Sequence, residues 1–129
     1  MLLECEGKAS IQSPKPSQIL KTILSLRSFG PSSYASLTRD DGSYLQVAGG
    51  GVTCLLEQYQ SGTGLRLRAF SEVKSKAHPD GTVLVFRAGE IPMMSDEWFT
   101  ATQVSNAFCC FLQGDKFPSE INWRPAIGF

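Results

Sequence analysis

The chain has 129 residues, of which 42% are hydrophobic and 19% charged. This composition excludes an intrinsically disordered protein, because disorder requires low hydrophobicity and a strong charge excess, and the length is that of one typical domain, so we expect residues 1–129 to form a single domain. Twelve basic and twelve acidic residues cancel, which argues against nucleic acid as the main partner, because duplex binders carry a basic excess.

The amino terminus and the cysteines indicate a cytoplasmic protein. Residues 1–6 contain Glu4 and Glu6, whereas a secretory signal has a basic start and a longer apolar run. No apolar stretch approaches the roughly 20 residues that span a bilayer, so we expect no membrane contact. The cysteine spacing matches neither a zinc knuckle nor a disulfide framework, so we expect reduced thiols. The four cysteines are Cys5, Cys54, Cys109 and Cys110.

The amino-terminal third predicts a short strand in the first residues and then a helix. Residues 13–16 are a break, and Ser17 is the expected N-cap because its side chain can accept a backbone N–H. Gly30 and Pro31 are expected to end the helix. Apolar residues follow Ser17 at helical spacing: Ile19, Leu20, Ile23, Leu24 and Leu26.

The middle of the chain predicts two β-hairpins separated by the glycines at 49–51. An Asp-Asp-Gly sequence at residues 40–42 joins the first pair of strands, and a Gly-containing loop at 61–64 joins the second, because these residues favour tight turns. The four predicted strands are 34–39, 43–48, 52–59 and 65–70.

Two further strand patterns carry more specific expectations. Arg66 and Arg68 alternate with apolar residues, which is typical of a strand with one solvent-facing side. Residues 82–87, after a turn at 78–81, contain the continuous apolar run Val-Leu-Val-Phe, and this run predicts a central strand covered on both faces.

A second helix is predicted near the carboxyl end. Thr100 and Gln103 form a capping-box pattern, although a start at Ser95 is an alternative, and Gly114 ends the helix. A short strand follows at 120–124. The predicted fold class is α+β, an antiparallel sheet of about five to six strands packed with two helices. The buried helical face consists of Val104, Ala107, Phe108, Phe111 and Leu112.

Each residue that could carry catalysis has a simpler structural explanation. His78, the single histidine, lies in a turn, where we expect it to be exposed rather than to act as a base. Cys109 and Cys110 are expected to pack on a helix. The acid pairs at 40–41 and 96–97 fit a hairpin tip and a helix start. We therefore expect no catalytic residue, no cofactor and no metal ion.

One segment favours a binding function. Residues 88–115 contain no Lys or Arg, and aromatic residues and methionines lie beside acids within them. We predict that Glu90, Asp96, Glu97 and Trp98 contact a partner, the acids through electrostatic attraction and Trp98 through contact area. The alternative is a loop and helix start that only cover the core.

The carboxyl-terminal pattern resembles a known group of proteins. Phe111 and Leu112 end a helix, Gly114 and Pro118 follow, and then comes the Ile-Asn-Trp sequence at 121–123. This pattern resembles immunity proteins of bacterial polymorphic toxin systems, including contact-dependent inhibition. The resemblance implies a non-enzymatic protein that binds and neutralises a cognate toxin domain, a nuclease or deaminase, in the producing cell.

The resemblance carries over no toxin-contacting residue. The neutral net charge also departs from the strongly acidic immunity proteins that mimic nucleic acid, so a local acidic patch or a partner of mixed charge fits better. The alternative function is a small enzyme or ligand-binding domain whose site uses residues scattered along the sequence.

Overall fold

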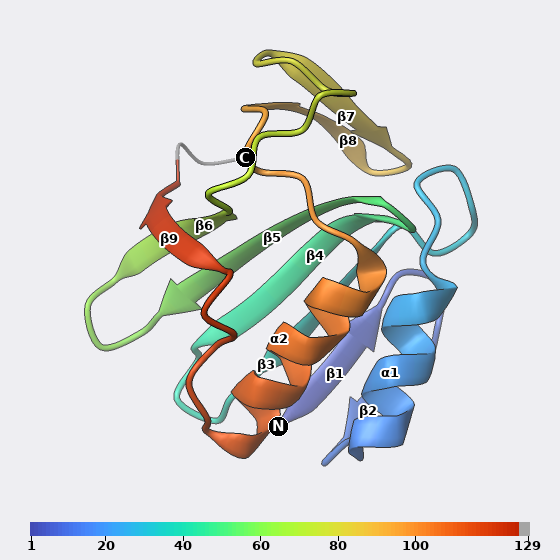
Figure 1. The fold of residues 1–129 in the computed structure, drawn as a ribbon. Helices are drawn as coiled ribbons and strands as arrows, with labels where there is room; N and C mark the ends of the chain where they lie inside the picture. The colour runs from blue at the N-terminus through green and yellow to red at the C-terminus, as the bar shows by residue number, and fades with distance from the viewer. Residues whose placement is uncertain (127–129) are drawn as a thin grey trace.

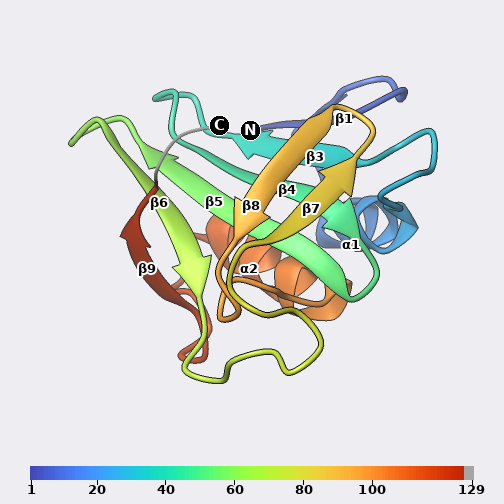
Figure 2. The same cartoon turned by 90° about the horizontal axis from the view of Figure 1, so that it is seen from above.

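The computed structural model describes residues 1–126 and has an α+β fold, as predicted. Helices α1 (Pro16–Ser25) and α2 (Ala101–Gln113) lie side by side on one face of an antiparallel sheet (Figure 1). A hairpin of β7 (Thr82–Phe86) and β8 (Gly89–Met93) lies over the opposite face (Figure 2). No helix within the described range is long and apolar enough to cross a bilayer.

The main sheet has seven strands in the described part of the chain, more than the sequence patterns predicted. One of the additional strands is β2, which has two residues and is therefore too short to show the alternation of apolar and polar residues that predicts a strand. Both predicted hairpins are present, and the Asp-Gly turn pairs Thr38 with Tyr44. In sheet order the strands are β2 (Ile11–Gln12), β1 (Leu2–Cys5), β3 (Tyr34–Thr38), β4 (Tyr44–Gly50), β5 (Thr53–Gln60), β6 (Leu65–Phe70) and β9 (Asn122–Pro125).

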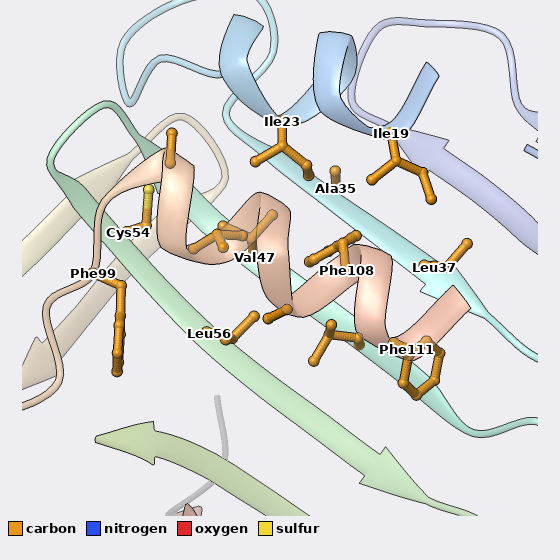
Figure 3. Packing of buried hydrophobic residues seen from close by; sticks show 14 of the residues in the cluster. Ile19, Ile23, Ala35, Leu37, Val47, Cys54, Leu56, Phe99, Phe108 and Phe111 are labelled. Carbon is orange, nitrogen blue, oxygen red and sulfur yellow. The ribbon is translucent and has the colours of Figure 1, made fainter. Parts of the chain in front are cut away.

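The main core lies between the helices and the sheet. Ile23 of α1 and Phe108 of α2 meet Val47 and Leu56 of the sheet, and all four side chains are buried (Figure 3). The predicted apolar face of α2 is confirmed, with its last member, Leu112, only partly buried. The predicted stripe of α1 is wider than the buried one, because Leu20 and Leu24 are exposed.

Local capping signals place α2 correctly and α1 incorrectly. The Thr100 hydroxyl accepts the Gln103 N–H at 3.2 Å, and the Gln103 side chain accepts the Thr100 N–H at 2.9 Å. This capping box excludes the alternative start at Ser95. The predicted cap at Ser17 is wrong, because α1 already begins at Pro16, whose fixed φ suits the first helical position. The helix also ends at Ser25, before Gly30, because the next residue is extended.

The glycine run at 49–51 continues β4 instead of breaking the strand before it. Gly49 and Gly50 belong to β4, and the turn to β5 comes at Gly51 and Val52. A Cβ atom at Gly50 would overlap the carbonyl of Leu26. Glycine therefore lets the end of α1 pack directly on the backbone of β4.

The position predicted for β7 is wrong. This strand pairs only with β8 among the described strands, so it is not central in a sheet. Leu84 and Phe86 face the main sheet and are buried, whereas Val83 and Val85 are 44% and 40% exposed. A continuous apolar run is typical of a strand covered on both faces, but here one face of the run remains open.

Candidate binding surface

A cluster of buried charges lies beneath the β7–β8 hairpin. Arg68 Nε donates to Glu57 Oε2 at 2.8 Å, and Arg68 Nη1 lies 3.4 Å from Glu97 Oε1. Arg68 is only 7% exposed, so the prediction of a solvent-facing residue is wrong. The alternation of β6 was read correctly, but the face that carries Arg68 is covered by the hairpin and lies beside two carboxylates.

The second arginine of this cluster comes from β9. Arg124 Nη2 lies 2.6 Å from Asp96 Oδ1 and 3.0 Å from Glu97 Oε2. Glu97 Oε1 also accepts the backbone N–H of Met94 at 2.7 Å. The hydrogen bonds that the Arg124 guanidinium donates to Asp96 and Glu97 raise its pKa. Asp96 and Glu97 have no basic residue near them in the sequence, because residues 88–115 contain no Lys or Arg. Their charges are instead neutralised by Arg68 and Arg124, which lie far away in the sequence.

Burial determines the electrostatics of Glu57. Its side chain is 1% exposed, and this burial raises the pKa of its carboxyl, while Arg68 and Arg66 oppose the rise. Removing charged groups from water is costly, and the cost is recovered only through well-placed partners. The buried Glu57 therefore depends mainly on its close ion pair with Arg68.

A cleft of about 530 Å³ opens between β8 and the β6–β9 edge of the sheet. Arg68, Glu97 and Arg124 lie along it, and Glu90 stands exposed on β8. Its volume falls within the range of small-molecule sites. The apolar residues that line it are Ile91, Pro92, Met93, Met94 and Pro125.

A second cleft, of about 300 Å³, lies on the other side of the hairpin, between β7 and the loop after α1. Phe29, on that loop, is 84% exposed. The ring of Trp98 stacks on His78 with centroids 4.2 Å apart, so His78 is half-buried instead of exposed as predicted. The Trp98 Nε1 atom is buried and has no hydrogen-bond partner among residues 1–126. Val83 and Val85 complete the wall formed by β7.

The four predicted contact residues lie in different environments. Glu90 is exposed and Glu97 is 3% exposed, although both line the larger cleft. Asp96 is half-buried against Arg124, and Trp98 lines the smaller cleft. Burial of Glu97 agrees with the alternative interpretation that this segment covers the core, whereas Glu90 and Trp98 remain accessible. Their contact with a partner stays a prediction.

Sequence reasoning missed the exposed Phe29 and the arginines of the charge cluster. Phe29 lies directly before the Gly30-Pro31 sequence that was predicted to end the first helix, and no pattern of neighbouring residues marks it as exposed. Arg68 and Arg124 meet the acids at 96–97 only through strand pairing, because Arg68 lies opposite Arg124 in the β6–β9 register. The alternation of β6 was the one available signal, and it showed only that Arg68 lies on the face opposite the helices.

The cysteines show no arrangement for metal or disulfide chemistry. All four are free thiols, and burial raises the pKa of Cys54 to about 12. Cys109 and Cys110 are half-buried on α2. Within residues 1–126, no group of three or more histidines, cysteines or acids is arranged to hold a metal ion.

Comparison with known proteins finds no match for this chain among family profiles, curated proteins or solved structures.

Proposed function

We propose that this protein is an immunity protein that binds and neutralises a cognate toxin domain, a nuclease or deaminase, in the cytoplasm of the bacterium that produces it. The observation that carries the proposal is the apolar surface beside β7, where Phe29, Val83 and Val85 are exposed next to Trp98. Aromatic residues that supply large contact areas dominate the energetics of protein interfaces.

The charge distribution supports recognition through apolar contacts supplemented by a few charges. Asp96 and Glu97 are bonded to arginines, so they offer little net negative charge to a basic toxin surface. Glu90 is the exposed acid among the predicted contact residues. Mimicry of nucleic acid, which needs a strongly acidic surface, fits this neutral chain poorly.

The bonding of the candidate catalytic residues also favours a binding role. Glu97 uses both carboxylate oxygens to hold Met94, Arg68 and Arg124. His78 stacks on Trp98, and its Nδ1 lies 3.2 Å from the Ser75 hydroxyl. These groups support the local structure of residues 75–98, which contributes Val83, Val85 and Trp98 to the apolar surface.

Coexpression tests the proposal directly. The toxin domain encoded immediately upstream of this gene would be produced in a susceptible host, alone and together with this protein. We expect growth arrest with the toxin domain alone, and both restored growth and a co-purifying complex with the pair. Persistent arrest in the presence of folded immunity protein would contradict the proposed function.

Binding of a small ligand is a second candidate, and the 530 Å³ cleft is the observation that favours it. Apolar walls with a few converging polar groups are typical of ligand sites. A thermal-shift screen with small carboxylic acids and amines would test it, because a ligand that binds the folded state raises Tm with its concentration. If Tm stays unchanged across the screen and coexpression rescues growth, ligand binding is contradicted and the immunity function is supported.

A further inference from the structure

The outer edge of β7 carries backbone groups without partners. Arg87 donates its N–H away from β8, to the carbonyl of Ser28 at 3.1 Å. Backbone groups of alternate residues in a strand point to the same side, so those of Val83 and Val85 also point away from β8. These N–H and C=O groups make no hydrogen bond within residues 1–126, and they face the cleft that Phe29 borders.

The other strand edges are protected in ways that β7 is not. In the main sheet, β2 is only two residues long and β9 carries Arg124 and Pro125. On the outer side of the hairpin, β8 carries Glu90 and Pro92. Short strands, charges and prolines are the usual means of preventing unwanted pairing at an edge. The sequence of β7, Thr-Val-Leu-Val-Phe, contains no charge and no proline.

The sequence of β7 is therefore that of a central strand, although the strand lies at an edge. The continuous apolar run is typical of a strand with neighbours on both sides. The hairpin sheet, however, has only two strands among the described residues, which is the smallest antiparallel sheet possible. A third strand beside β7 would remove the open edge, because it would pair the backbone groups of Val83 and Val85, and its own side chains would pack beside theirs.

We propose that the outer edge of β7 binds an extended segment of the toxin domain as a third strand of the hairpin sheet. This inference rests on the proposed immunity function and specifies its mode of recognition. The Ser28–Arg87 hydrogen bond closes one end of the edge, so the incoming strand pairs within residues 82–86. Because Phe29, Val83 and Trp98 surround it, the segment is uncharged and rich in β-branched or aromatic residues.

A single extended segment fits this edge better than a second copy of the protein. The loop that carries Phe29 stands across the cleft from β7. Antiparallel pairing of two β7 edges would bring both of these loops into the same space. A strand that projects from a toxin surface brings no such loop.

Amide hydrogen exchange tests the inference in the unaltered protein. The Val83 and Val85 amides should exchange rapidly in the free protein and slow by about tenfold or more in the toxin complex, since pairing protects an amide until it opens. Equally rapid exchange in a complex that still neutralises the toxin would overturn the inference and leave the immunity function intact.

A matched pair of variants tests the same edge through affinity. Val85→Pro removes a backbone N–H that points outward from the hairpin, and edge strands tolerate proline at such positions. Val85→Thr keeps that N–H. Exchange of the inward Leu84 amide in each free variant verifies that the hairpin is intact. We expect Val85→Pro to weaken toxin binding by about tenfold, in line with the loss of a backbone hydrogen bond and its neighbours, and Val85→Thr to bind almost as the natural protein. Equal affinities would contradict strand addition.

Two further outcomes separate this inference from its alternatives. If coexpression shows no neutralisation, the pentapeptide acetyl-Thr-Val-Thr-Val-Thr-amide serves as the probe, and amide shifts confined to β7 would support strand binding without the toxin. No shift at millimolar peptide would then overturn the inference. A concentration-dependent dimer that Val85→Pro abolishes would also overturn it, by assigning the edge to a second copy of the chain.

Discussion

Arg68 shows how one buried side chain links three segments of this protein. It contacts Glu57 on the neighbouring strand and Glu97 in the segment before α2. We expect Arg68→Met to destabilise the fold by about 3–5 kcal/mol, because the buried Glu57 loses its close counter-charge and Glu97 loses one of its two arginines. Urea unfolding measures this loss.

Arg66 provides the matched control for that change. It lies on the same face of β6, 3.9 Å from Glu57, but its side chain is 37% exposed. A solvent-screened pair contributes less than about 1 kcal/mol, so Arg66→Met should cost little. Similar losses for the two variants would show that burial does not set the strength of the cluster.

The thiols give a second test at the residue scale. Cys54 is fully buried, and burial raises its pKa to about 12, so its thiolate is scarce at neutral pH. Titration with a thiol reagent should leave Cys54 unmodified in the native protein and should count four thiols after unfolding without reductant. A count of two or none would mean that the cysteines form disulfides.

At the scale of elements, α2 tests the main core. Phe108 is fully buried against α1 and the sheet (Figure 3). Phe108→Ala should cost about 3–5 kcal/mol in denaturant unfolding, the usual range for a buried aromatic residue. Phe29→Ala, at an exposed position, should change stability by less than about 0.5 kcal/mol. A loss below about 1 kcal/mol for Phe108→Ala would contradict the packing of this helix.

Elements determined by local signals were predictable from the sequence, and those determined by partners were not. Thr100, Gln103 and Gly114 define both ends of α2 within a few residues, so its limits could be predicted. The position of β7 depends on which strands pair with it, and an apolar run gives no information about pairing. Strand β8 was missed because its proline, Pro92, favours a loop interpretation.

The candidate site was predictable to the same limited extent. A window without Lys or Arg drew attention to Glu90 and Trp98, which line the two clefts. The same window could not show that Arg68 and Arg124 approach Asp96 and Glu97, because those contacts arise from the pairing of β6 with β9.

At the scale of the molecule, the two faces of the sheet have different roles. The helices bury one face in the main core, while the β7–β8 hairpin lies over part of the other (Figure 2). The hairpin also borders two clefts. This arrangement leaves apolar side chains exposed beside β7 and a neutralised charge cluster beneath the hairpin. We propose that the toxin is recognised by the surface formed by β7 and by Phe29 on the loop after α1.

The most direct test of this account is the affinity of the toxin domain for two matched variants. Phe29→Glu places a charge beside β7, and Leu65→Glu places one at an exposed apolar position at the start of β6. The β5–β6 turn, which this end of β6 adjoins, lies away from β7 and β8 (Figure 2). Surface plasmon resonance should show that Phe29→Glu weakens binding by about thirtyfold or more, mainly through faster dissociation, as for an interface anchor. Leu65→Glu should bind as the natural protein does. Unchanged affinity for Phe29→Glu would contradict a toxin-binding surface at the hairpin.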